Sequence, residues 1–169
     1  MIKTKGPALG LHLNPSKCEF SWLNPNCDKP CPIRMENVDE EAQVKLIPTS
    51  EIQMLGVPLG SFEFVDDFVK KKLLSRLDST MQKLVEFEDS QAALFLLRIS
   101  FSITRAVHFM RSTPLVLWRE QAVVFDSKIR AAAETIIARP MSERVYNEAC
   151  LTPTLGGLGL RKTVEHADG

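Results

Sequence analysis

The sequence SFEFVDDFVKKK, from Ser61 to Lys72, decides how the second part of the chain folds. Its adjacent acids, Asp66 and Asp67, can hold divalent metal ions if they stand in a turn between two strands. The residues around them instead repeat apolar side chains every three or four positions, as one face of a helix does. In a first helical turn, the two acids suit the helix dipole and can pair with Lys70 and Lys71 four residues later. The stretch therefore predicts a helix rather than a metal site.

The same period continues beyond this stretch, so residues 61–169 are predicted to be helical. The first helical face runs over residues 62–85. Asp89-Ser90 provides the start of a second helix, and Thr113-Pro114 ends it. The predicted apolar face of this second helix consists of Phe95, Leu96, Ile99, Ile103, Ala106, Val107 and Met110. Further helices are predicted over 116–138 and 143–150.

Residues 1–60 have a different composition, because they hold seven of the ten prolines. Proline breaks a helix interior but is tolerated at strand ends and in turns. Short strand-like pieces lie between the prolines, over residues 18–23, 43–47 and 52–57. The chain is therefore predicted to be α+β, with a small antiparallel β unit over 1–60 and a mostly helical bundle over 61–169.

Composition limits the class of protein. The chain has 169 residues, of which 44% are hydrophobic, so it can bury a core. Lys plus Arg and Asp plus Glu both number 21, so no overall basic excess indicates a nucleic-acid partner. No apolar run is long enough to cross a bilayer, and the N-terminus lacks the pattern of a signal peptide. We expect a protein of the nucleus or cytoplasm that is not secreted and has no membrane partner.

A second candidate metal site consists of cysteines. Cys18, Cys27 and Cys31, with His12 nearby, follow no common zinc-binding spacing. In the expected intracellular setting, cysteines are more often thiols than disulfides. The sequence therefore predicts no metal site and no cofactor in this chain.

Five short motifs, in this order, resemble the end of the palm and the thumb of reverse transcriptases encoded by retrotransposons. They are GLHLNPSKCE at 10–19, LGVPLG at 55–60, GSFEFV at 60–65, RSTP at 111–114 and LGGLGL at 155–160. None of these motifs is specific alone, but together they span nearly the whole chain. The resemblance implies a palm end with a primer-grip-like hairpin over 1–60 and a thumb-like domain over 61–169.

The resemblance also implies a function. In that family, an RNA-directed DNA polymerase, the catalytic carboxylates lie upstream of the Gly-Leu-x-Leu-Asn pattern, and therefore upstream of Met1. This chain would hold the primer–template duplex, either RNA–DNA or DNA, and would be inactive alone. Its partners would be the missing palm and fingers, and the full-length family enzyme would use Mg²⁺. The alternatives are a helical protein-interaction module and a domesticated remnant that has no function.

Individual site residues follow from the same resemblance. Lys17 matches the lysine of the palm-end pattern and would act as a general acid toward the leaving pyrophosphate. Leu55, Gly56 and Leu59 would form the primer grip. The run from Leu155 to Leu160 lacks the ending of a phosphate-binding loop, and it is predicted to be a close-packed turn that returns to the helices.

Basic residues gather in the predicted thumb. Residues 91–139 contain seven basic and three acidic residues, a local excess of four. On a helical wheel of about 100° per residue, Arg98, Arg105 and His108 lie opposite the predicted apolar face, with Arg111 at its edge. Such a stripe suits the phosphates of a duplex. A solvated helix face would show the same pattern.

Overall fold

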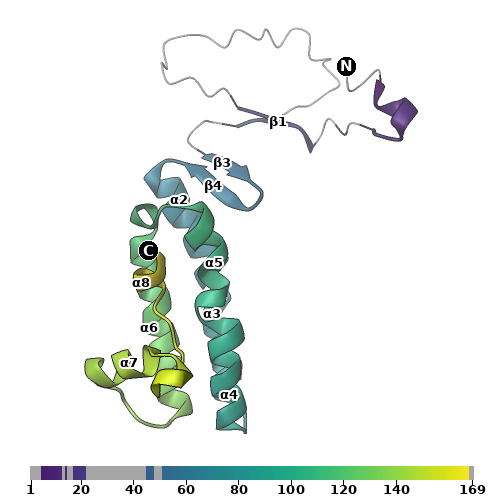
Figure 1. Ribbon diagram of the computed structural model, residues 1–169. Coiled ribbons are helices and arrows are strands. Elements are labelled where there is room, and N and C mark those ends of the chain that lie inside the picture. The colour runs from purple at the N-terminus through teal and green to yellow at the C-terminus, as the bar shows by residue number, and fades with distance from the viewer. Residues whose placement is uncertain (1–4, 13, 15–16, 22–44, 48–50, 168–169) are drawn as a thin grey trace.

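A computed structural model describes residues 5–12, 14, 17–21, 45–47 and 51–167 of the chain. Cys27 and Cys31, and parts of the strands predicted over 18–23 and 43–47, lie outside these residues. The fold is α+β, as predicted, with small strand pairs before a bundle of helices (Figure 1). Most of residues 61–167 are helical.

The strands form two separate pairs. After the short 3₁₀ turn η1 (Pro7–Leu9), β1 (Glu19–Phe20) pairs with β2 (Lys45–Leu46) in parallel. This parallel pair departs from the predicted antiparallel unit. Parallel pairing requires a long connection between the strands, and residues 21–44 provide its length.

The second pair is an antiparallel hairpin of β3 (Glu51–Met54) and β4 (Val57–Gly60), with Ile52 opposite Leu59. The single strand predicted over 52–57 was wrong, because the chain turns after Met54. Leu55 and Gly56 form this turn with φ of 51° and 81°. A two-residue hairpin turn of type I′ requires positive φ at both positions, and it matches the twist of the strands.

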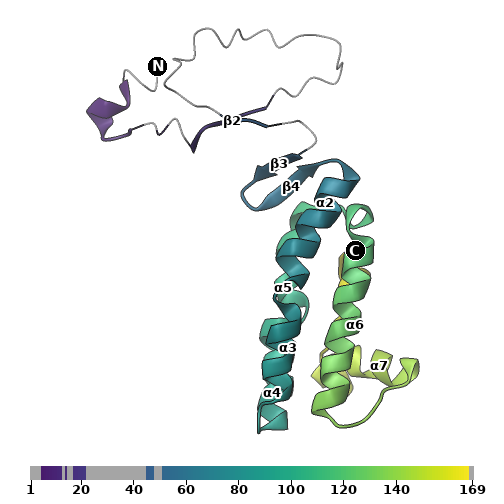
Figure 2. The same ribbon diagram turned by 180° about the vertical axis from the view of Figure 1, so that it is seen from behind.

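The helices form three long antiparallel segments, best followed in Figures 1 and 2. The first contains α2 (Phe62–Val69), the π-helical turn η4 (Lys70–Leu74) and α3 (Leu77–Val85). The second contains α4 (Ser90–Leu96), the π-helical turn η5 (Leu97–Phe101) and α5 (Ile103–Ser112). The third is α6 (Arg119–Ile136), preceded by the short turn η6 (Leu115–Leu117). The chain ends with α7 (Glu143–Cys150), η7 (Pro153–Leu155) and α8 (Thr163–Ala167).

Two of the helices, α2 and α4, begin at residues whose side chains cap them. The hydroxyl of Ser61 accepts a hydrogen bond from the backbone N–H of Phe64 at 3.3 Å, at the start of α2. The carboxylate of Asp89 accepts hydrogen bonds from the N–H groups of Gln91 and Ala92 at 2.8 and 3.1 Å. These side chains satisfy donors that a helix start leaves free. The predicted start at Asp89-Ser90 is therefore confirmed.

Asp66 and Asp67 lie inside α2, so the predicted helix is confirmed, but they stand in its second turn, and Asp66 binds Gln121 instead of the predicted Lys70. Both carboxylate oxygens of Asp66 lie 3.1 Å from the amide nitrogen of Gln121, which donates from α6. Asp67 pairs with Lys71 at 2.5 Å, four residues later. One acid therefore joins α2 to α6, and the other forms an exposed ion pair along the helix.

The π-helical turn η5 shifts the buried face of the second segment. The buried positions are Ala93, Leu97, Ser102, Ile103, Ala106 and Phe109, and the step from Leu97 to the next one, Ser102, is five residues. A π turn contains one residue more than an α turn, so it produces this longer step. The predicted apolar face was wrong on the N-terminal side, because Phe95 and Ile99 are 52% and 43% exposed.

The core is one cluster shared by all three segments. Both π turns, together with α3 and α4, contact α6. At one end of the bundle, the aromatic rings of Phe68, Phe109 and Trp118 lie in a row, with centroids 6.5 and 6.1 Å apart. The indole N–H of Trp118, which is fully buried, donates to the backbone carbonyl of Thr113 at 3.2 Å. This packing holds α5 against the start of α6.

Among the described residues, one helical stretch is long and apolar enough to cross a membrane by length and composition, Ser90–Ser112. Within the bundle, α4 contacts α3 and α6, η5 contacts α6, and α5 contacts α8. One third of the stretch's most apolar 18-residue window, 33%, is buried in this way. The stretch also carries Arg98, Arg105 and Arg111.

The run Leu155–Leu160 closes the end of α7, which confirms the predicted close-packed turn. The N–H of Leu158 donates to the carbonyl of Ala149 at 2.9 Å, and that of Gly159 donates to Leu151 at 2.8 Å. These bonds satisfy carbonyls that the helix end leaves free. A Cβ at Gly157 would lie 2.1 Å from the carbonyl oxygen of Leu151, so this position has room only for glycine.

Asp126 of α6 holds the start of α8. Its carboxylate accepts hydrogen bonds from the N–H groups of Thr163 and Val164 at 2.9 and 3.1 Å. Burial raises the pKa of Asp126, although these hydrogen bonds act in the opposite direction. The last short helix is therefore fixed to the third segment of the bundle through a carboxylate.

Arg130 joins α6 to α7 through Glu143, and it forms a second ion pair with Glu134 within α6. Its guanidinium lies 3.1 Å from Glu134 and 2.6 Å from Glu143. It also donates to the carbonyl of Met141 and stacks 5.0 Å from the ring centre of Tyr146. The hydrogen bond that the N–H of Met141 donates to Glu134 is the main cause that lowers the pKa of this glutamate, and Arg130 lowers it further. Arg130 lowers the pKa of Glu143.

We expect this junction to weaken in acid. Both glutamates have folded-state pKa values below the ordinary 4.5. Their contribution to stability is therefore fully present above pH 4.5 and is lost as the pH falls through the folded pKa values. Urea unfolding of the wild type and of Glu134→Gln should show a stability difference at neutral pH that disappears in acid. A difference that persists unchanged in acid would contradict this assignment.

Candidate nucleic-acid interface

The structure brings the predicted primer-grip hairpin against the helix that carries the predicted basic residues. A Cβ at Gly56 would lie 3.5 Å from Nε2 of His108, on α5. β4 also contacts α2, so the hairpin sits at one end of the bundle (Figures 1 and 2). Two groups of residues that are far apart in the sequence therefore meet through Gly56 and His108.

The tip of this hairpin is apolar and exposed. Leu55 is 93% exposed, and Met54 and Leu59 are also exposed. Leucine is an unusual choice at Leu55, because side chains with a Cβ adopt positive φ at an energetic cost. A strained and exposed residue of this kind contributes nothing to the core, so the tip is a candidate contact surface.

Replacing Leu55 with asparagine is expected to stabilise the protein. Asparagine tolerates positive φ and is preferred at the first position of a type I′ turn. Removing most of the strain should raise stability by about 1 kcal/mol and Tm by about 2–4 °C. Differential scanning calorimetry measures the change.

Leu59→Asn is the matched control, because Leu59 is an exposed leucine in the extended strand β4. It should not raise Tm, since asparagine is disfavoured in strands. If Leu55→Asn and Leu59→Asn lower Tm equally, the turn at Leu55 is not strained.

Arg105, His108 and Arg111 follow one another along α5 at intervals of three residues, and all three are exposed. The guanidinium of Arg105 lies 5.3 Å from the ring centre of Phe101, so stacking orients it. Residues three apart are neighbours on a helix surface. The three side chains therefore form a ridge that passes the hairpin at Gly56. We call Leu55, Arg105, His108 and Arg111 the hairpin–α5 surface.

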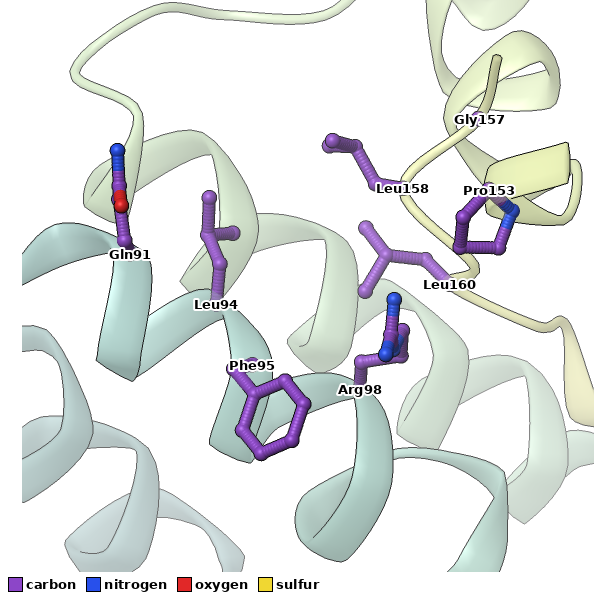
Figure 3. A pocket seen from close by; sticks show the side chains of 8 residues that line it. All are labelled: Gln91, Leu94, Phe95, Arg98, Pro153, Gly157, Leu158 and Leu160. Carbon is purple, nitrogen blue, oxygen red and sulfur yellow. The ribbon is translucent and has the colours of Figure 1, made fainter.

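Arg98 is not part of the hairpin–α5 surface. It is half-buried, and its guanidinium stacks 5.4 Å from the ring centre of Phe95. A Cβ at Gly159 would lie 2.8 Å from Cδ of Arg98, so the arginine stem packs on the C-terminal segment (Figure 3). Arg98 follows buried Leu97, whereas Arg105 precedes buried Ala106, so they flank the buried face on opposite sides. The single stripe predicted for the three arginines was therefore wrong, because η5 changes the helical register.

All charged residues of the second helical segment are basic. Ser90–Ser112 contains no Asp or Glu, and its three arginines make no ion pair with a carboxylate within the described part of the chain. By contrast, five other cations of the bundle form ion pairs, namely Lys71, Lys128, Arg130, Arg144 and Lys162. The arginines of this segment therefore remain free to bind an external anion.

Lys17 is not part of the hairpin–α5 surface. It is exposed, and its backbone N–H donates to the carbonyl of Asn14 at 3.1 Å. It precedes β1, and β1 and β2 lie beyond the hairpin, away from the helices (Figures 1 and 2). The proposed general-acid role of Lys17 remains a prediction from the family resemblance.

Nothing in the described residues gathers as a metal site. His12 is exposed, and the thiol of Cys18 donates to the carbonyl of Asn14 at 3.4 Å. Within residues 5–12, 14, 17–21, 45–47 and 51–167, no three His, Cys, Asp or Glu side chains come together.

Sequence patterns alone did not find two features. The contact between Gly56 and His108 joins residues that are distant in the chain, and no periodicity links a hairpin to a helix. The second missed feature is that Arg98 and Arg161 line one hollow, because the C-terminal segment folds back on the bundle. Gly157 and Gly159 were the available signal, since an added Cβ would meet the backbone of Leu151 at Gly157 and the side chain of Arg98 at Gly159.

Compared with protein-family models, with curated proteins and with solved structures, the chain matches none.

Proposed function

We propose that this chain is the palm-end and thumb portion of a retroelement reverse transcriptase and that it holds a primer–template duplex. The observation that supports this best is the second helical segment, which contains no acid and whose Arg105 and Arg111 pair with no carboxylate among the described residues. The hairpin that resembles a primer grip lies beside the same segment. The five motifs that resemble the family occur in order on these elements.

The proposal assigns one role to each part of the hairpin–α5 surface. Arg105 and Arg111 bind phosphates, which are the anions that an RNA–DNA or DNA duplex presents regardless of sequence. Leu55 provides an apolar contact at the hairpin tip. The catalytic carboxylates and their Mg²⁺ would belong to the rest of the palm, with the fingers as a further partner. This chain alone would then bind a duplex weakly and would not extend a primer.

A matched pair of double variants tests this function. Arg105→Gln with Arg111→Gln removes two charges from the hairpin–α5 surface. Lys83→Gln with Arg144→Gln removes the same charge from exposed positions on α3 and α7. Fluorescence anisotropy with a short RNA–DNA hybrid, at about 50–200 mM salt, measures affinity and its dependence on salt.

The two variants should differ in the slope of log affinity against log salt. Each lost phosphate contact reduces that slope by about 0.9 on B-form DNA, with a somewhat different value on a hybrid. Arg105→Gln with Arg111→Gln should therefore flatten the slope by about 1.8, whereas the control should retain it. Equal slopes in both variants, or no salt-sensitive binding by the wild type, would reject duplex binding by this surface.

The second candidate is a helical protein-interaction module, as the sequence also allows. It is favoured by the exposed apolar side chains around Arg98, which lie away from the hairpin. An inert remnant is the third candidate. It would show neither kind of binding.

A further inference from the structure

A groove runs between the second helical segment and the C-terminal segment. It consists of two adjoining hollows that share Arg98 and Pro153, with volumes of about 290 and 580 Å³. The smaller hollow is lined mainly by apolar side chains, among them Leu94, Leu158 and Leu160 (Figure 3). We call the two hollows together the C-terminal groove.

The larger hollow is cationic and rich in hydroxyl groups. Arg98 and Arg161 line it together with three threonines, at 104, 152 and 154. Among the described residues, no Asp or Glu lines either hollow. Neither arginine makes an ion pair with a carboxylate in the described part of the chain. The larger hollow therefore presents two unpaired guanidinium groups to an anion.

Arg98 is held in place before any ligand arrives. Its guanidinium stacks on Phe95, and its stem occupies the space that Gly159 leaves by having no Cβ. Gly159 also has a positive φ of 74°, which glycine adopts readily. A charged group that is already fixed loses little conformational entropy on binding, so this arrangement favours recognition of a carboxylate or phosphate.

The surroundings of the groove favour a protein over a nucleic acid. Ile99 and Leu158, which line it, and Phe95 beside Arg98, are exposed aliphatic or aromatic side chains. A phosphate backbone would leave these side chains in water, whereas an extended peptide can cover them with its own apolar residues. Clustered exposed apolar residues with a cation at their centre are typical of protein-docking surfaces.

We propose that the C-terminal groove binds an acidic, aliphatic peptide segment of a partner protein. Carboxylates of the segment pair with Arg98 and Arg161, and an adjacent aliphatic side chain enters the hollow between Leu94 and Leu158. Neither Arg98 nor Arg161 belongs to the hairpin–α5 surface. The peptide site and the proposed duplex binding can therefore be tested with separate variants.

The test is a selection from a library of peptides with twelve random residues, using the full chain as bait. Counter-selection against Arg98→Gln with Arg161→Gln retains only peptides that require the two arginines. We expect the recovered peptides to carry Asp or Glu next to Leu, Ile or Phe. Each should bind the double variant at least about tenfold more weakly, since hydrogen bonds between charged groups are lost. Arg105→Gln with Arg111→Gln should bind them as well as the wild type does.

Two further variants separate binding from folding. Arg161→Gln alone changes an exposed side chain and should leave thermal melting unchanged while weakening the peptides severalfold. Arg98→Lys keeps the charge but loses the planar guanidinium, so it should recover only part of the affinity.

Three outcomes would overturn the proposal. They are recovery of no peptide that depends on the arginines, recovery of peptides without acids, and equal binding to Arg161→Gln and wild type. The RNA–DNA hybrid is the remaining probe. If Arg98→Gln with Arg161→Gln reduces hybrid affinity as much as Arg105→Gln with Arg111→Gln does, the groove is part of a nucleic-acid surface and the peptide site is rejected.

Discussion

Gly157→Ala is expected to destabilise the protein by about 3 kcal/mol, at the upper end for an overpacked site. The added Cβ would lie 2.1 Å from the carbonyl oxygen of Leu151 and 2.7 Å from that of Glu148. Both atoms belong to the backbone, so no change of rotamer relieves the contact. The C-terminal segment would have to leave the end of α7, and Tm should fall by about 6–12 °C.

Gly156→Ala is the control for this effect. At Gly156 an added Cβ meets nothing within 4 Å, but φ is 82°. This substitution therefore measures backbone strain alone, which is about 1–2 kcal/mol. Urea unfolding of both variants should place Gly157→Ala clearly below Gly156→Ala. If the two are equally stable, the close approach of the segment to Leu151 does not occur.

Trp118→Ala is expected to have the largest effect on stability, about 3–5 kcal/mol. Trp118 is 0% exposed, its ring contacts Phe109, and its N–H binds the carbonyl of Thr113. The substitution leaves a large cavity where α5 joins α6, and it also leaves a carbonyl without its donor. Circular dichroism during urea unfolding measures the loss.

Val116→Ala, two residues away, is the matched control. Val116 is 73% exposed, so its truncation should change stability by no more than about 0.5 kcal/mol. Trp118→Phe should lie between the two variants, because it keeps much of the ring packing but not the N–H donor. A loss below about 1 kcal/mol for Trp118→Ala would show that this site is not part of the core.

Local signals predicted the helices well. Asp89 predicted the start of α4, Thr113-Pro114 predicted the end of α5, and the bounds 143–150 match α7. The placement of Asp66 and Asp67 in a helix was also correct. Each of these predictions depends on residues within a few positions of one another, where capping and periodicity act.

Features that depend on long-range packing could not be predicted in this way. The strand predicted over 52–57 proved to be most of β3, the turn and the first residue of β4, because Leu55 adopts a conformation that its side chain disfavours. The prediction of a single arginine stripe was wrong because η5 adds a residue to one helical turn. No local residue type marks such a π turn. The contacts of Gly56 with His108 and of Gly159 with Arg98 depend on tertiary packing.

The π turn η5 has a consequence for any comparison of this chain with a relative. If the equivalent helix of that relative is a regular α-helix, the two sequences align correctly only with a one-residue gap inside Leu97–Phe101. An alignment without the gap would match α5 correctly and assign every residue of α4 to a neighbouring helix face. Arg98 would then be paired with a position on the wrong side, although both proteins had the same bundle.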